Sequence, residues 1–158
     1  MKKILLFSIS LITLISCETT QIEGCTDSNA INYNYQADIN NNTCDYTADI
    51  LFYMNVDAAI FFSDNNVQKL TFHIDGNQIG SQYNDGGFYY SNGVPSCFDN
   101  LFTTGSVYWS QISYNSIYWE AIDENGDIWY DNNSTLVANE CLAMELTAEK
   151  LKAYQENN

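Results

Sequence analysis

Turn-forming Asn, Asp and Gly residues divide residues 49–146 into short runs that are rich in aromatic and β-branched side chains. In one run Leu70, Phe72 and Ile74 alternate with polar residues, which is the period of a half-buried strand. Asp75-Gly76-Asn77 follows directly and is typical of a tight hairpin turn. Short strands at this spacing predict an all-β domain, an antiparallel β-sandwich, over residues 49–146.

The rest of the chain from residue 49 onward is expected to contain one more hairpin turn, further strands and a short helix. Glu124-Asn125-Gly126-Asp127 is expected to form a second hairpin turn. Residues 59–62 are expected to begin or extend a strand, and Thr147 to cap a short C-terminal helix (148–154) within a final segment of residues 147–158. The remaining strands are expected at residues 50–56, 67–75, 78–83, 106–113, 116–122, 128–130, 135–138 and 140–146.

The N-terminus is organised like an export signal. Met1-Lys2-Lys3 precedes an apolar run of about 12 residues, which is shorter than the roughly 20 that cross a bilayer. A charged start, a short apolar run and the small Ser16 predict a secretory signal peptide over residues 1–16. Leu14-Ile15-Ser16-Cys17 resembles the lipobox of bacterial lipoproteins, which implies an acylated Cys17 at the new N-terminus.

The resemblance to a lipoprotein implies attachment to a membrane. Two or three acyl chains anchor a protein firmly, whereas one chain does not. Glu18, directly after the cysteine, is compatible with sorting to the outer membrane of Gram-negative bacteria, and the face of that membrane is left open. The alternative is an ordinary signal peptide with Cys17 as a free thiol. Residues 17–23 are expected to form a polar tether.

The number of cysteines agrees with export and lipidation. If Cys17 is acylated, four of the five cysteines remain, an even number suited to two disulfides in an oxidising compartment. Four cysteines allow three pairings. A Cys25–Cys44 bridge would close a loop of about 20 residues, stabilise the fold by roughly 3 kcal/mol, and constrain a polar module (24–46) that lacks hydrophobic periodicity.

The polar module resembles a short, cysteine-bracketed module of secreted and surface proteins from marine gliding-type bacteria. The resemblance implies a spacer or adhesive element. The usual Asp-Gly-Ser before the second cysteine is Asn41-Asn42-Thr43 in this chain. The matching residues are Gly24, Cys25, Thr26, Asp27, Ala30, Asn32, Tyr33, Ala37, Cys44 and Tyr46.

The β domain resembles a small β-sandwich that recurs in bacterial lipoproteins. The similarity consists of a hairpin at 72–80, a mid-domain Cys97, a second hairpin at 118–129, and a last strand that begins with Cys141. It implies a Cys97–Cys141 bridge, which would close a loop of about 45 residues and add roughly 4 kcal/mol. Proximity within each module favours this bridge together with the Cys25–Cys44 bridge.

The charge balance limits the classes of partner. The chain has 20 acidic residues, five lysines and no arginine, and two of the lysines belong to the signal peptide. Nucleic acids are bound through Lys and Arg contacts to phosphate, so a nucleic-acid partner is not expected. An anionic membrane surface would also repel the chain, which leaves the anchoring to the lipid.

No residue pattern indicates an enzyme. A hydrolase triad needs a base beside a nucleophile, and the single histidine, His73, is expected to face solvent on a strand. Acidic residues are so frequent that no carboxylate pair is informative for glycoside chemistry. The sequence therefore predicts a protein without catalysis.

Calcium is the one candidate cofactor. Oxygen-bearing residues at 38, 40 and 42 have the i, i+2, i+4 spacing of calcium loops, without the glycine and final glutamate of an EF-hand. The same spacing at residues 123–127 is better explained by a plain hairpin turn. The candidate ligands are Asp27, Asp38, Asn40, Asn42 and Asp45.

Adjacent aromatic pairs recur on the expected strands, so one member of each pair would face outward. An outward row is typical of a sugar-binding face, and Trp119, Trp129 and Tyr130 are the candidate glycan contacts. Alternatively, these rings cap the core or contact a protein partner. The predicted function is that of an exported, lipid-anchored surface protein with a structural or adhesive role, and the alternative is a glycan- or calcium-binding module.

Overall fold

The computed structural model describes residues 20–149, and strands form most of the regular structure in that range. The predicted all-β class is confirmed. The described residues form a two-stranded sheet (β1-β2), a three-stranded sheet (β6-β3-β9) and a four-stranded sheet (β5-β4-β7-β8). The elements are β1 (Glu23–Gly24), β2 (Ile39–Asn40), β3 (Asp45–Met54), α1 (Val56–Asp64), β4 (Lys69–Ile74), β5 (Asn77–Tyr83), β6 (Thr103–Ser110), β7 (Tyr114–Asp123), β8 (Ile128–Val137) and β9 (Cys141–Leu146).

Both predicted hairpins are present. Strands β4 and β5 pair antiparallel around Asp75 and Gly76, whose φ angles of 48° and 77° are those of a tight hairpin turn. Strands β7 and β8 pair antiparallel around the turn that contains Gly126, with φ 92°. The two short strands expected at 128–130 and 135–138 are parts of one strand, β8.

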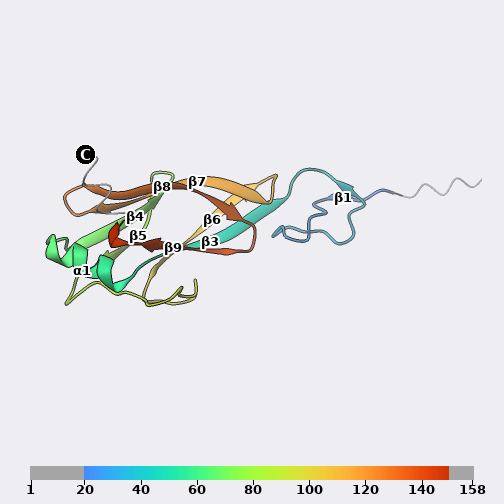
Figure 1. Cartoon of the computed structure of the whole chain (residues 1–158). Coiled ribbons are helices and arrows are strands. Elements are labelled where there is room, and N and C mark those ends of the chain that lie inside the picture. The colour runs from blue at the N-terminus through green and yellow to red at the C-terminus, as the bar shows by residue number, and fades with distance from the viewer. Residues whose placement is uncertain (1–19, 150–158) are drawn as a thin grey trace, which may run out of the picture.

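Strand β3 lies at the centre of the molecule and is buried on both faces from Ile50 to Met54. On one face the Phe52 ring stacks on Phe72 of β4 at 4.7 Å and meets Trp119 of β7 at 5.0 Å. On the other face Leu51 packs in a separate apolar cluster. Buried residues of the three-stranded and four-stranded sheets therefore belong to one apolar core, and Figure 1 shows how the strands of these sheets are arranged.

Two glycines let the edges of these sheets come close together. A Cβ on Gly80 of β5 would lie 2.6 Å from Cγ2 of Thr103 on β6. A Cβ on Gly105 of β6 would lie 3.0 Å from Cδ1 of Ile79 on β5. A side chain at Gly80 would therefore require Thr103 to shift, and one at Gly105 would require a smaller shift of Ile79.

The prediction of a strand at residues 59–62 is wrong, because this segment belongs to helix α1. The Asn55 side chain accepts a hydrogen bond from the backbone N–H of Ala58 at 2.9 Å, which caps the helix. Ala58, Ala59 and Phe62 share the buried face. An apolar run this short fits a strand and a helix equally well, and the N-cap decides between them.

The expectation that the β domain (49–146) is antiparallel is also wrong for one pair of its strands. Strand β9 pairs with β3 in parallel, with Asp49 opposite Cys141 and Met54 opposite Leu146. Parallel neighbours need a long connection between them. Here that connection contains every strand from β4 to β8, so β9 returns to β3 in the same direction.

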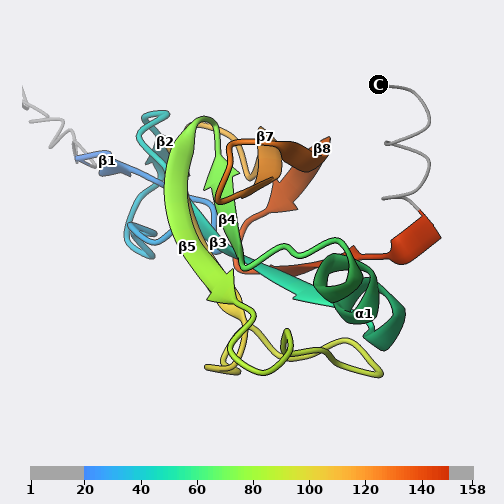
Figure 2. The same ribbon diagram turned by 90° about the vertical axis from the view of Figure 1, so that its left-hand side faces the viewer.

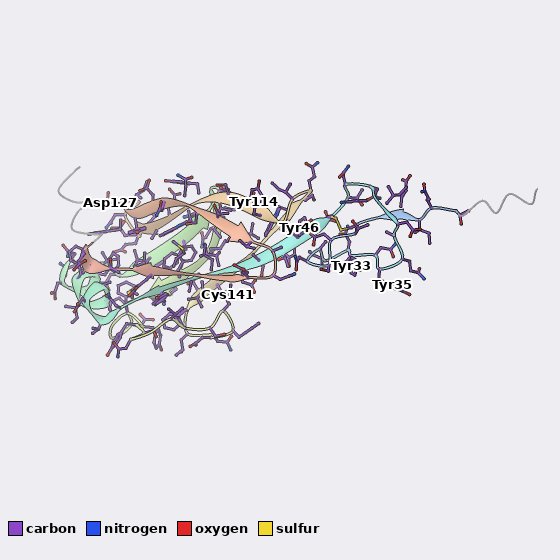
Figure 3. All side chains as sticks on the ribbon, turned by 45° about the vertical axis from the view of Figure 1, so that its right-hand side comes forward. Tyr33, Tyr35, Tyr46, Tyr114, Asp127 and Cys141 are labelled. Atoms are coloured by element: carbon purple, nitrogen blue, oxygen red, sulfur yellow. A yellow bond between two sulfur atoms is a disulfide. The ribbon has the colours of Figure 1, made fainter. Side chains whose placement is uncertain are left out.

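The polar module (24–46) lies at one end of the molecule and α1 lies at the other (Figure 1). Its two cysteines form the predicted Cys25–Cys44 disulfide. At the junction with β3, Tyr46 is buried and packs against Trp109 of β6, with ring centroids 6.0 Å apart (Figure 3). The predicted signal peptide, Cys17 and residues 150–158, which include most of the expected C-terminal helix, lie outside the described residues.

Candidate functional site

A long segment, residues 84–102, connects β5 to β6; we call it the aromatic loop. Cys97 forms a disulfide with Cys141 of β9, as the resemblance implied, and attaches the loop to the three-stranded sheet. Phe88 is buried in the main core, and the backbone N–H of Ser91 donates to the carbonyl of Met54 at 2.9 Å. The loop is therefore held at several points; Figure 2 shows its course between β5 and the three-stranded sheet.

Large apolar side chains on the aromatic loop are exposed to solvent. Phe98 is 88% exposed and Val94 is 74% exposed. Single exposed apolar residues are ordinary, but a group of them on one segment marks an interaction surface. The exposed apolar residues of the loop are Tyr89, Tyr90, Val94, Phe98 and Leu101.

Three cavities in the described part of the chain have the aromatic loop as one wall. A cavity of about 530 Å³ lies along the Cys97–Cys141 disulfide, between residues 94–98 and the β3–β9 edge. A second, of about 240 Å³, lies between the end of β5 and the loop. A third, of about 230 Å³, lies between the loop and α1. Concave surface therefore adjoins the exposed rings along the loop.

Asp27, one of the predicted calcium ligands, accepts hydrogen bonds within the module. Asp27 accepts from the backbone N–H of Asn29 at 2.9 Å and from the Tyr46 hydroxyl at 2.9 Å. Burial and this bond to a carboxylate both raise the pKa of Tyr46. Asp27 therefore connects the start of the module to the start of β3.

The other predicted calcium ligands differ in their hydrogen bonds and in their exposure to solvent. Asn40 accepts from the backbone N–H of Asn42 at 2.9 Å, and Asp45 accepts from the Ser110 hydroxyl at 2.6 Å. Asp38 is exposed. Within residues 20–149 no group of three or more His, Cys, Asp or Glu side chains is arranged to hold a metal ion. Calcium binding stays a prediction.

The outward position predicted for the candidate glycan contacts Trp119 and Tyr130 is wrong, because both are buried; glycan binding itself stays a prediction. Trp119 is 0% exposed, stacks on Tyr130 at 4.9 Å and donates from Nε1 to the Ser134 hydroxyl at 3.1 Å. Tyr130 is also buried, and half-buried Trp129 packs against the Phe61 ring of α1. Trp119 and Tyr130 therefore belong to the core and Trp129 packs against it, in agreement with the alternative in which these rings cap the core.

Asp123 organises the β7–β8 turn, as the hairpin interpretation of residues 123–127 predicts. Its carboxylate accepts from the backbone N–H groups of Asn125 and Asp127 at 2.8 and 3.0 Å, and from Nε1 of Trp129 at 3.0 Å. Burial acts to raise the pKa of Asp123, but these hydrogen bonds outweigh it and the pKa is lowered. The ionised carboxylate is thus part of the fold rather than a site.

A polar row crosses the outer face of the four-stranded sheet. His73 lies opposite Glu120, and Glu120 lies opposite Asp131. The Tyr118 hydroxyl donates to Asp131 at 3.1 Å, and desolvation followed by the effect of this carboxylate raises the pKa of Tyr118 to about 12. His73 is half-buried rather than solvated, and its Nδ1 is shielded without a hydrogen-bond partner.

The aromatic loop is the feature that sequence reasoning missed. Residues 84–102 have neither strand nor helix period, so the sequence pattern predicts no regular element in them. A usable signal was present in the density of Tyr, Phe, Val and Leu in a stretch without periodicity, because apolar residues that build no regular element are free to form a surface.

Comparison with known proteins assigns this chain to no family. Among the described residues, no helix combines the length and apolar character needed to cross a membrane. No protein-family model, no curated protein and no solved structure matches this chain.

Proposed function

We propose that the protein is an exported, lipid-anchored surface protein that acts by non-covalent adhesion, with the aromatic loop as its contact surface and without catalysis. One observation carries this proposal: exposed apolar side chains gather on a single loop that a disulfide attaches to the sheet. Attachment lowers the entropy that the loop would lose on binding, which favours a preformed contact surface.

The arrangement along the chain supports the proposal. Cys17, the proposed lipid site, lies three positions before the first described residue. The described part of the chain begins at the end of the molecule formed by the module (Figure 1). The disulfide-bridged module would then act as a spacer between the membrane and the β domain. We further propose that the two larger sheets form a β-sandwich, supported by the stacking of Phe52 on Phe72 across the core.

The charge of the surroundings limits the partner. Lys69 is the only lysine between residues 20 and 149, and the chain has no arginine. Asp85 and Asp99 lie within the aromatic loop itself. The proposed partner is therefore a protein or glycan at the cell surface that is neutral or basic where it meets the loop.

Cys17→Ser is expected to move the protein from the membrane fraction to the soluble fraction, because the acyl chains are the proposed anchor. Both disulfides are expected to form, since neither involves Cys17. Cell fractionation with a non-reducing gel measures both outcomes. A variant that stays with the membrane, or that fails to fold, would contradict the assignment.

A double substitution, Val94→Ser with Phe98→Ser, tests the contact surface. We expect at least a tenfold loss of attachment, about 1.4 kcal/mol, because Phe98 and Val94 are exposed anchors of the loop. The measurement is the binding of labelled full-length protein to cells that lack it, by flow cytometry. Ile112→Ser, at a 51% exposed apolar residue outside the loop, is the matched control. Unchanged attachment of the double variant would refute the proposed surface.

A further inference from the structure

The cavity at the end of β5 contains an unusual residue. It is lined by Ser81, Gln82 and Tyr83 of β5 and by Asp85, Gly87, Tyr89 and Leu101 of the aromatic loop. Gln82 is only 5% exposed, and its side-chain oxygen and nitrogen are both shielded without a hydrogen-bond partner. Buried polar groups are nearly always paired, so an orphaned amide in a cavity wall calls for an explanation.

The fold itself does not require an amide at this position. Gln82 lies opposite Leu70, a fully buried residue of the main core, so an apolar side chain would suit the same face of β5. A polar residue kept where burial penalises it is typical of functional sites, at which stability is traded for binding.

The lining selects the chemistry of a ligand. Its only charged side chain is Asp85; Lys69, the cross-strand neighbour of Tyr83, is not part of the lining. An anion is therefore disfavoured. A cation would suit Asp85 but would leave the donor of the Gln82 amide unpaired, because an ammonium group only donates. A hydroxyl both donates and accepts, and so matches both atoms of the amide.

The aromatic residues of the lining complete the match. Tyr83 and Tyr89 are each 57% exposed, so ring surface is available at the cavity. A ring-shaped ligand with an apolar face and hydroxyl edges would contact the tyrosines with its face and Gln82 and Asp85 with its edges. We propose that this cavity is a subsite for a neutral saccharide ring, which deepens the proposed adhesive function and rests on it.

Contact with the Gln82 amide requires a small movement of the cavity wall, because both amide atoms are shielded. Gly86 and Gly87 adjoin Asp85 and have φ angles of 95° and 121°, in the region that only glycine adopts readily. A Cβ at either glycine would meet nothing within 4 Å, so there is open space beside both glycines. The proposal requires this glycine turn to shift into that space when a ligand enters.

Full-length protein purified in detergent, applied to an array of neutral and anionic glycans, tests this proposal. We expect binding to one or more neutral glycans and none to sulfated or uronic-acid glycans. Gln82→Met keeps the side-chain volume and removes both orphaned polar atoms. It is expected to weaken binding at least tenfold while raising the melting temperature. Gln78→Met, the same change at an exposed position of β5, is the control and should alter neither.

Tyr89→Ala is a second variant of the same cavity, which tests the subsite even if Gln82→Met folds poorly. It removes an exposed ring and is expected to weaken binding at least tenfold, whereas Tyr108→Ala, at a 71% exposed tyrosine of β6, should not. The proposal is overturned if no neutral glycan binds, or if binding survives both Gln82→Met and Tyr89→Ala. Loss of attachment in the Val94 and Phe98 double variant, without any glycan binding, would leave the adhesive function standing and refute the saccharide subsite alone.

Discussion

Replacing Phe52 with alanine is expected to lower the free energy of unfolding by about 3–5 kcal/mol. Phe52 is 0% exposed and joins the two larger sheets, because its ring contacts Phe72 on β4 and Trp119 on β7. Removing the ring leaves a cavity at the centre of the core, where rigid strands on both sides restrict collapse. Domains of this size are stable by only about 5–15 kcal/mol, so the variant would be close to unfolding.

Urea denaturation followed by tryptophan fluorescence measures this loss, since Trp119 lies against the substituted position. Phe52→Leu keeps most of the volume and is expected to cost less than the alanine variant. Tyr108→Ala removes a similar ring that is 71% exposed and is expected to change stability by less than about 0.5 kcal/mol. Equal stability of the Phe52→Ala and Tyr108→Ala variants would show that the two sheets do not depend on this contact.

The strands could be predicted because their signals are local. Alternation at Leu70, Phe72 and Ile74 corresponds to strand β4, which has these three side chains buried. The turn at Asp75 and Gly76 was predictable because positive φ at two successive residues restricts the residue types that fit. Such signals depend on a few neighbouring residues and on no distant contact.

The features that sequence reasoning missed depend on distant contacts. Parallel pairing of β9 with β3 is decided by the path of the whole chain between them. Burial of Trp119 follows from its stacking on Tyr130 and from the sheet that covers it, so the order of residues within β7 did not reveal it. Two adjacent aromatic residues on a strand point to opposite faces of the sheet. Which of the two is buried depends on the face that the other sheet covers.

The candidate site was hidden for a related reason. Gln82 is a polar residue in a polar stretch of β5, so only the register with Leu70 reveals that it faces the core. The aromatic loop lacks a period, and its attachment point, Cys97, was expected only through the resemblance to a lipoprotein domain. Local pattern therefore predicted the scaffold and left the binding surface undefined.

Replacing Cys97 and Cys141 together with serine is expected to cost about 4 kcal/mol of stability in the chain-entropy model, because the bridge spans 44 residues. The variant should also release the aromatic loop, since Cys97 is its covalent link to the three-stranded sheet. Urea denaturation measures the first effect. Limited proteolysis measures the second, as faster cleavage within residues 84–102 under conditions where the sheets stay folded.

The Cys25→Ser and Cys44→Ser double variant separates the two effects. That bridge spans 19 residues and would stabilise the fold by roughly 3 kcal/mol in the same model, but it lies in the module. We expect its loss to expose the module to protease and to leave cleavage of the aromatic loop unchanged. If both variants release the loop equally, the loop depends on global stability rather than on its own disulfide. If neither does, Phe88 and the Ser91 hydrogen bond to Met54 suffice to hold it, and attachment by Cys97 would not explain a preformed contact surface.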